Sequence, residues 1–129
     1  MPAVIQYGVE STRDASFAFA GPAVNVGYPR WWEPLKPGTN RQPDESEQLG
    51  DFLDSFGNHL RVLAVANGSK QPRPTVIEGL TDKTSGLGLV RFNKQKRTVT
   101  IDCWPLDIAP TAADAKQFPG WPVTIELPT

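Results

Sequence analysis

The sequence has very few of the side chains on which most catalytic and metal sites depend. It contains one histidine, His59, among its 129 residues, and one cysteine, Cys103. A zinc site needs three or four His or Cys ligands, and a catalytic pair of metal ions needs several His, Asp and Asn ligands. His59 stands at the start of an apolar run, where a surface or hydrogen-bonded histidine is commoner than a catalytic one. The sequence therefore predicts no catalytic residue, no metal site and no cofactor.

The single cysteine also excludes an internal disulfide. Cys103 alternates with Val99 and Ile101 along a strand-like run. This spacing predicts a buried thiol that behaves as a small apolar side chain rather than as a reactive group.

The chain has neither an excess of one charge nor a long apolar run. Thirteen Lys and Arg against fourteen Asp and Glu give a net charge of −1, and the densest basic stretch, 94–97, fits a solvated turn. Nucleic-acid binding needs a concentrated positive field, so no nucleic-acid partner is predicted. No segment approaches the ~20 apolar residues that cross a bilayer, and there is no secretory signal pattern. We therefore expect a soluble, cytoplasmic chain with no membrane partner.

Proline and glycine, in contrast, are abundant, with thirteen and eleven residues. Proline interrupts helices, so we expect short strands joined by turns. The predicted strands are 4–9, 16–26 with a bulge or chain end at Pro22, 59–66, 75–80, 87–92, 98–104 and 123–127. The 87–92 and 98–104 runs are typical of an antiparallel hairpin, and 59–66 is apolar on both faces, as in a central strand. With a short helix predicted from Thr111 to about Phe118, the expected fold is all-β, mainly an antiparallel sheet or β-sandwich, with one or two short helices in a single domain, 1–129.

A proline-rich loop, about residues 27–50, is long for a small domain, and such loops are often functional. It contains Arg30, Trp31 and Trp32, and a further tryptophan, Trp121, stands between prolines near the end. An exposed indole can stack on a sugar or insert into a partner, with Arg30 as a polar neighbour, so these four residues are the candidate contacts. The alternative is that the tryptophans fold back over a sheet edge. The acidic residues of 44–54 match no calcium loop and are expected to be solvated.

A family resemblance rests on phrases that run in order along almost the whole chain. They are residues 5–9, 13–14, 16–24, 28–30, 56–67, 82–92, 97–104 and 117–125, of which Phe118-Pro119-Gly120-Trp121-Pro122 is the most specific. In these phrases the chain resembles the C-terminal region of alkaline phosphatase D-like metallophosphoesterases. That family is often exported, binds two metals in an α/β sandwich and hydrolyses phosphate esters. Its last metal-binding phrase, Gly-Asp-x-His, lies upstream of the part that resembles residues 4–9, so the resemblance supplies no catalytic residue to this chain.

The resemblance implies a non-catalytic β domain that acts by protein–protein association. Strands that pack on the rest of an enzyme would here expose apolar surface, at a cost of roughly 25 cal/mol per Å². The predicted partner is a second copy in a homodimer, or another protein that covers an apolar sheet face. Three alternatives stay open: a small-ligand or carbohydrate-binding module that uses the loop tryptophans, an enzyme of unfamiliar type, and a subunit completed by a separate metal-bearing polypeptide.

Overall fold

The computed structural model describes residues 1–8, 16–24, 30–69 and 83–127 of the chain. These residues form seven strands in two antiparallel sheets. The larger sheet has the order β2-β1-β4-β3 and consists of β1 (Ala3–Gly8), β2 (Phe17–Ala20), β3 (Gly50–Leu53) and β4 (His59–Val65). The smaller sheet has the order β5-β6-β7 and consists of β5 (Gly86–Asn93), β6 (Thr98–Pro105) and β7 (Val123–Glu126). The predicted all-β fold is confirmed.

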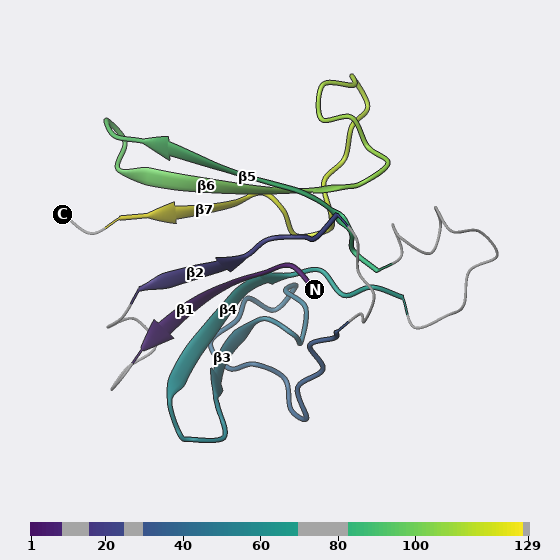
Figure 1. The fold of residues 1–129 in the computed structure, drawn as a ribbon. Helices are drawn as coiled ribbons and strands as arrows, with labels where there is room; N and C mark the ends of the chain where they lie inside the picture. Colours follow the sequence, from purple (N-terminus) through teal and green to yellow (C-terminus); the bar gives the residue numbers. More distant parts are fainter. Residues whose placement is uncertain (9–15, 25–29, 70–82, 128–129) are drawn as a thin grey trace.

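The two sheets lie one above the other and share one apolar core (Figure 1). Strand β1 contributes Val4 and β4 contributes Ala64, while Ile101 and Cys103 come from β6 and Ile125 from β7. Alternate residues of a strand point to opposite faces, which is why the odd-numbered residues of β6 enter the core together. The alternation read from the sequence therefore places the core correctly in the smaller sheet.

The predicted hairpin and central strand are both present. Strands β5 and β6 pair from Gly86 with Pro105 to Asn93 with Thr98, and β4 lies between β1 and β3. Strand β2 ends at Ala20, two residues before Pro22, and is shorter than the predicted 16–26 strand. The predicted strand at 75–80 lies outside the described residues.

The helix predicted from Thr111 to Phe118 is wrong: this segment consists of turns, bends and irregular backbone. The Ala115 N–H donates to Ala112 O, a bond of turn type rather than of a continuing helix. The Gln117 side chain and the Phe118 N–H both bond to the backbone of β6 instead. Contacts with the sheet therefore override a helix that prolines on either side had already limited to two turns. The described residues contain no helix.

Strand β3 is absent from the sequence prediction, which placed residues 27–50 in a loop and resumed regular structure at His59. Its four residues, Gly50–Leu53, are too few to show an alternating pattern. They become a strand because they pair with residues 59–62 of β4, and because Thr39 forms a bridge to Asp51 on the other side. This pairing ties the end of the proline-rich loop to the larger sheet.

Cys103 is fully buried, as predicted, and burial raises the pKa of its thiol from 9.0 to about 12. Between these two pKa values only the unfolded chain loses the proton. The free energy of unfolding should therefore be insensitive to this group below pH ~9 and fall by up to about 1.4 kcal/mol per pH unit above it. We expect Cys103→Ala to remove this fall in the free energy of unfolding at alkaline pH, as measured by urea titrations. A thiol reagent should label Cys103 only where the chain unfolds. Rapid labelling of the native protein at neutral pH would contradict this.

Candidate functional site

The two loop tryptophans are half-buried and fixed by hydrogen bonds to the loop that follows β4 and to their own loop. The Trp32 N–H donates to Asn67 Oδ1 (2.8 Å), and Asn67 Nδ2 donates back to Trp32 O (2.9 Å). Both indole nitrogens donate to backbone carbonyls, Trp31 to Gly68 (2.5 Å) and Trp32 to Gln48 (2.8 Å). Their polar edges are therefore used within the chain.

The Trp32 ring forms one wall of an open, largely apolar groove of about 810 Å³. Phe52 of β3 packs edge-on against this ring, with the ring centroids 5.1 Å apart. The rest of the lining comes from the loop 33–39, from Asp51 and Leu53 of β3, and from His59 at the start of β4. The groove thus combines an aromatic wall with one imidazole, the carboxylates of Glu33 and Asp51 and the amine of Lys36, a composition that suits a small amphipathic ligand.

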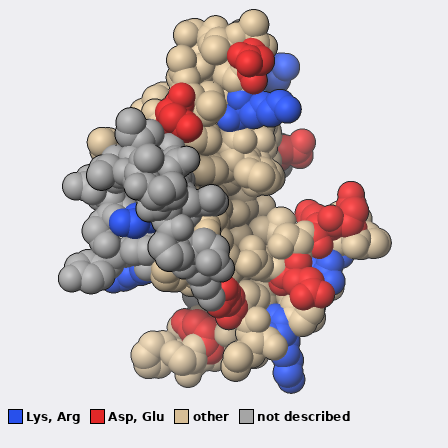
Figure 2. All heavy atoms as spheres, turned by 90° about the vertical axis from the view of Figure 1, so that its right-hand side faces the viewer, with Lys and Arg blue, Asp and Glu red and all other residues tan. Residues whose placement is uncertain are grey.

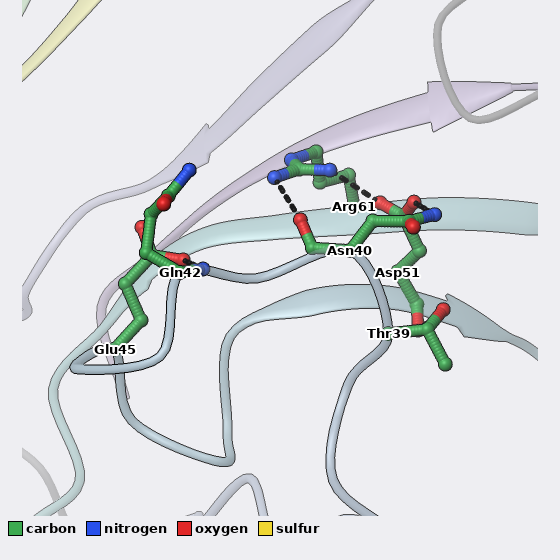
Figure 3. Close-up of polar contacts among 6 residues, drawn as sticks. All are labelled: Thr39, Asn40, Gln42, Glu45, Asp51 and Arg61. Carbon is green, nitrogen blue, oxygen red and sulfur yellow. Dashed lines mark hydrogen bonds and ion pairs between the residues drawn. The ribbon is translucent and has the colours of Figure 1, made fainter.

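A polar cluster beside the groove holds the loop against the sheet (Figure 3). Asp51 accepts hydrogen bonds from Arg61 Nη1 (2.9 Å) and from Asn40 Nδ2 (2.7 Å), and Arg61 Nη2 donates to Asn40 O (2.8 Å). The Asp51 and Arg61 side chains are only 8% and 17% exposed. Both carboxylate oxygens of Asp51 are occupied, so the role of this cluster is to brace the loop that carries Trp32.

The four candidate contacts predicted from the sequence do not come together. Trp32 lines the groove, whereas Trp31, Arg30 and Trp121 are not among its described lining residues. Arg30 is exposed, and Trp121 is only 8% exposed and belongs to the core. The centroids of the Trp121 and Phe19 rings are 5.8 Å apart. Of the four residues, Trp32 is therefore the one placed to present a ring to a ligand in a described groove.

A second buried polar group lies on the outer face of the smaller sheet. Asp102 of β6 is 1% exposed and forms an ion pair with Arg91 of β5. Gln117 donates to Asp102 Oδ1 (2.9 Å) and accepts the Cys103 N–H (2.8 Å). Every one of these contacts is internal to the chain, so the group fastens the 106–120 segment to β6.

The exposed apolar surface of β5 is a feature that reasoning from the sequence missed. Leu87, Leu89, Val90 and Phe92 are 48%, 40%, 42% and 78% exposed. The run Leu87-Gly88-Leu89-Val90-Arg91-Phe92 was read only as half of a hairpin. The sequence signal for this surface was the presence of apolar residues on both faces of the strand, a pattern typical of a strand that is covered on both sides. In the structure β5 lies at the edge of its sheet, where these residues are exposed.

Other classes of site find little support in the described part of the chain. No three His, Cys, Asp or Glu side chains gather there in a way that could hold a metal ion. Acidic and basic side chains are interspersed on the face shown in Figure 2. Within the same ranges there is no helix with the length and apolarity that membrane crossing requires.

Comparison of the chain with protein families, with curated proteins and with solved structures found no match. The resemblance to alkaline phosphatase D-like metallophosphoesterases therefore stays a prediction from the sequence.

Proposed function

We propose that this chain is a non-catalytic β domain, related to the C-terminal region of an alkaline phosphatase D-like phosphodiesterase, that acts by protein–protein association. The observation that carries the proposal is the apolar surface of β5. Its four exposed large apolar side chains lie within six residues of one strand. Leu87 and Leu89 lie on one face of the strand and Val90 and Phe92 on the other, so apolar side chains border the edge of the sheet on both faces. Exposed apolar surface of this kind on a soluble protein usually marks an interaction surface.

The position of β5 adds to this argument. Among the described strands, the sheet edges are formed by β2, β3, β5 and β7. Strand β5 has eight residues, whereas each of the other three has four. A long apolar edge strand exposes backbone donors and acceptors together with apolar side chains, and natural proteins usually cover or shorten such an edge. The simplest explanation for this long apolar edge is that a partner covers β5.

Association is tested by measuring the molar mass of the purified chain over about a hundredfold range of concentration, by sedimentation equilibrium. We expect the mass to rise with concentration towards that of a discrete oligomer. A mass that stays at 14.1 kDa over the whole range would overturn association with itself. Association with another protein would then have to be sought by co-purification, which also tests completion by a separate metal-bearing polypeptide.

A second candidate function, binding of a small ligand or carbohydrate, is favoured by the groove beside Trp32. Nuclear magnetic resonance separates it from association, because the Trp32 indole N–H is bonded to Gln48 O and reports on the groove wall. We expect a sugar panel to leave this signal unchanged if association is the function. A saturable shift that Trp32→Phe abolishes would favour the binding module. A metal-supplemented phosphodiesterase assay tests the remaining enzyme alternative, with background activity as the expected result.

A further inference from the structure

The free backbone groups of β5 can be assigned from its pairing with β6. The Gly86 N–H donates to Ala23 O (3.1 Å), away from β6, and its partner in the ladder is Pro105, which has no N–H. In an antiparallel ladder, alternate residues direct their N–H and C=O groups to the same side. The register runs without a shift to Asn93. The residues that direct both groups away from β6 are therefore Gly86, Gly88, Val90 and Phe92.

Three of these residues form the free edge. Gly86 already bonds to Ala23, and in the part of the chain that the structure describes, β5 pairs only with β6. The free donors and acceptors thus belong to Gly88, Val90 and Phe92. The edge carries exposed apolar side chains on both faces, and its one charged side chain, Arg91, is engaged by Asp102. The usual protection of an edge by inward charges or proline is missing.

We infer that the occupant of this edge is β5 of a second copy, paired antiparallel across a two-fold axis at Val90, so that two three-stranded sheets join into one of six strands. This inference rests on the proposed function of association and names its partner and its register. In this register Val90 faces Val90 of the partner copy, and Gly88 of each copy faces Phe92 of the other. All three free residues of both copies then exchange hydrogen bonds.

Neighbouring registers are less favourable. A pairing centred on Arg91 would place two arginine side chains directly opposite each other, which is destabilising. A pairing centred on Leu89 would place Phe92 opposite Gly86, whose N–H is taken by Ala23. The register centred on Val90 avoids both faults, because it sets Arg91 opposite Leu89. In this register Asn93, the last residue of β5 in the second copy, lies opposite Leu87. The paired strands therefore end one residue before Gly86, whose N–H bonds to Ala23 O.

The side chains on the inner face fit the same register. A Cβ atom on Gly88 would come within 2.7 Å of Phe19 Cζ and 3.3 Å of Pro22 Cδ, so these two residues cover the glycine. Phe92 is 78% exposed in the isolated chain. When it faces Gly88 of the other copy, its ring lies beside the Phe19 and Pro22 that cover that glycine. Phe92, the largest exposed side chain of β5, thereby lies opposite Gly88 of the other copy, which has no side chain.

Strand pairing of this kind buries an area at the low end for specific interfaces, so we expect a dimer in the micromolar range rather than a permanent one. The first test uses charge at the two-fold axis. Val90→Lys and Val90→Glu each place like charges opposite each other and should weaken the dimer at least about tenfold. An equimolar mixture of the two variants should form a mixed dimer, because Lys then faces Glu. Recovery on mixing also shows that both variants are folded.

The matched control is Leu53→Lys on β3, a side chain that is 63% exposed on the other sheet and should leave the dimer unchanged. A wild-type dimer that persists in Val90→Lys, or that is lost in Leu53→Lys, would overturn the β5 interface while leaving association itself standing. A wild-type chain that stays monomeric overturns the β5 dimer and association of the chain with itself, and leaves only association with another protein, which co-purification tests.

The second test fixes the register. Facing residues in a hydrogen-bonded antiparallel pair have Cα atoms about 5.5 Å apart, within the range of a disulfide. Under mild oxidation, Val90→Cys should form a covalent dimer, whereas Leu89→Cys should not, because Leu89 faces Arg91. Cys103 stays in place in both variants, since it is fully buried. A cross-link through position 89 in place of position 90 would overturn the register.

Discussion

Replacement of Trp121 by alanine is expected to lower the free energy of unfolding by about 3–5 kcal/mol, the range for removal of a large aromatic side chain from a core. Trp121 is 8% exposed and packs with Phe19, and it shares one cluster with Val4 and Ile125. This cluster joins the two sheets. The loss should therefore appear as one cooperative transition at lower urea, measured by far-ultraviolet circular dichroism, with an unchanged slope.

The matched control is Phe56→Ala. Phe56 lies in the turn between β3 and β4 and is 89% exposed. Its removal should change the free energy of unfolding by no more than about 0.5 kcal/mol. The comparison separates the two roles that the sequence allowed for Trp121. A Trp121→Ala chain of normal stability that had lost only an intermolecular contact would assign the residue to a binding surface, against its position in the core.

Replacement of Gly86 by alanine is expected to destabilise the chain by about 3 kcal/mol or more, because the added atom meets backbone rather than a movable side chain. A Cβ atom at Gly86 would lie 1.9 Å from Trp104 O. Gly86 opens β5, and its N–H donates to Ala23 O. Relief of the overlap has to separate the first residues of β5 from β6, which disturbs both the ladder and the contact with Ala23.

Gly21→Ala is the matched control for Gly86→Ala. A Cβ atom at Gly21 would meet Phe19 Cε1 and Cζ at 3.6 Å, an ordinary van der Waals distance, and Gly21 is exposed. We expect a change within about 1 kcal/mol, since the variant also reduces the conformational freedom of the unfolded chain. If Gly86→Ala proves too unstable to purify, its soluble yield beside that of Gly21→Ala gives the result. Equal stability of the two alanine variants would contradict the close approach.

The two candidate surfaces, the groove beside Trp32 and the edge of β5, differ in the hydrogen-bonding groups that they leave for a partner. The groove is bordered by Asp51 and Trp32, whose polar atoms are bonded within the chain, and a ligand would find mainly ring faces and apolar side chains there. The edge of β5 leaves backbone donors and acceptors of three residues without partners among the described residues. Hydrogen-bonding groups at an edge direct a partner in register as well as in affinity. For this reason association is the first proposal and ligand binding the second.

Local patterns in the sequence were sufficient for the elements whose partners are near in the chain. The β5–β6 hairpin follows from two β-rich runs around a polar turn, and the alternation of Val99, Ile101 and Cys103 predicted which face of β6 enters the apolar core. Turn chemistry and side-chain alternation act over a few residues, so one sequence is enough to detect them. The scarcity of histidine and cysteine was equally visible.

What only the tertiary structure decided concerns contacts between distant segments. The turns at 111–118 replace a helix because Gln117 and Phe118 bond to β6, and Trp121 belongs to the core because Phe19 lies beside it. The place of β5 at an edge, which makes its apolar residues a candidate interface, depends on the order of strands in the sheet. Each of these outcomes depends on free energy gained when residues far apart in the chain meet, which the local residue pattern does not encode.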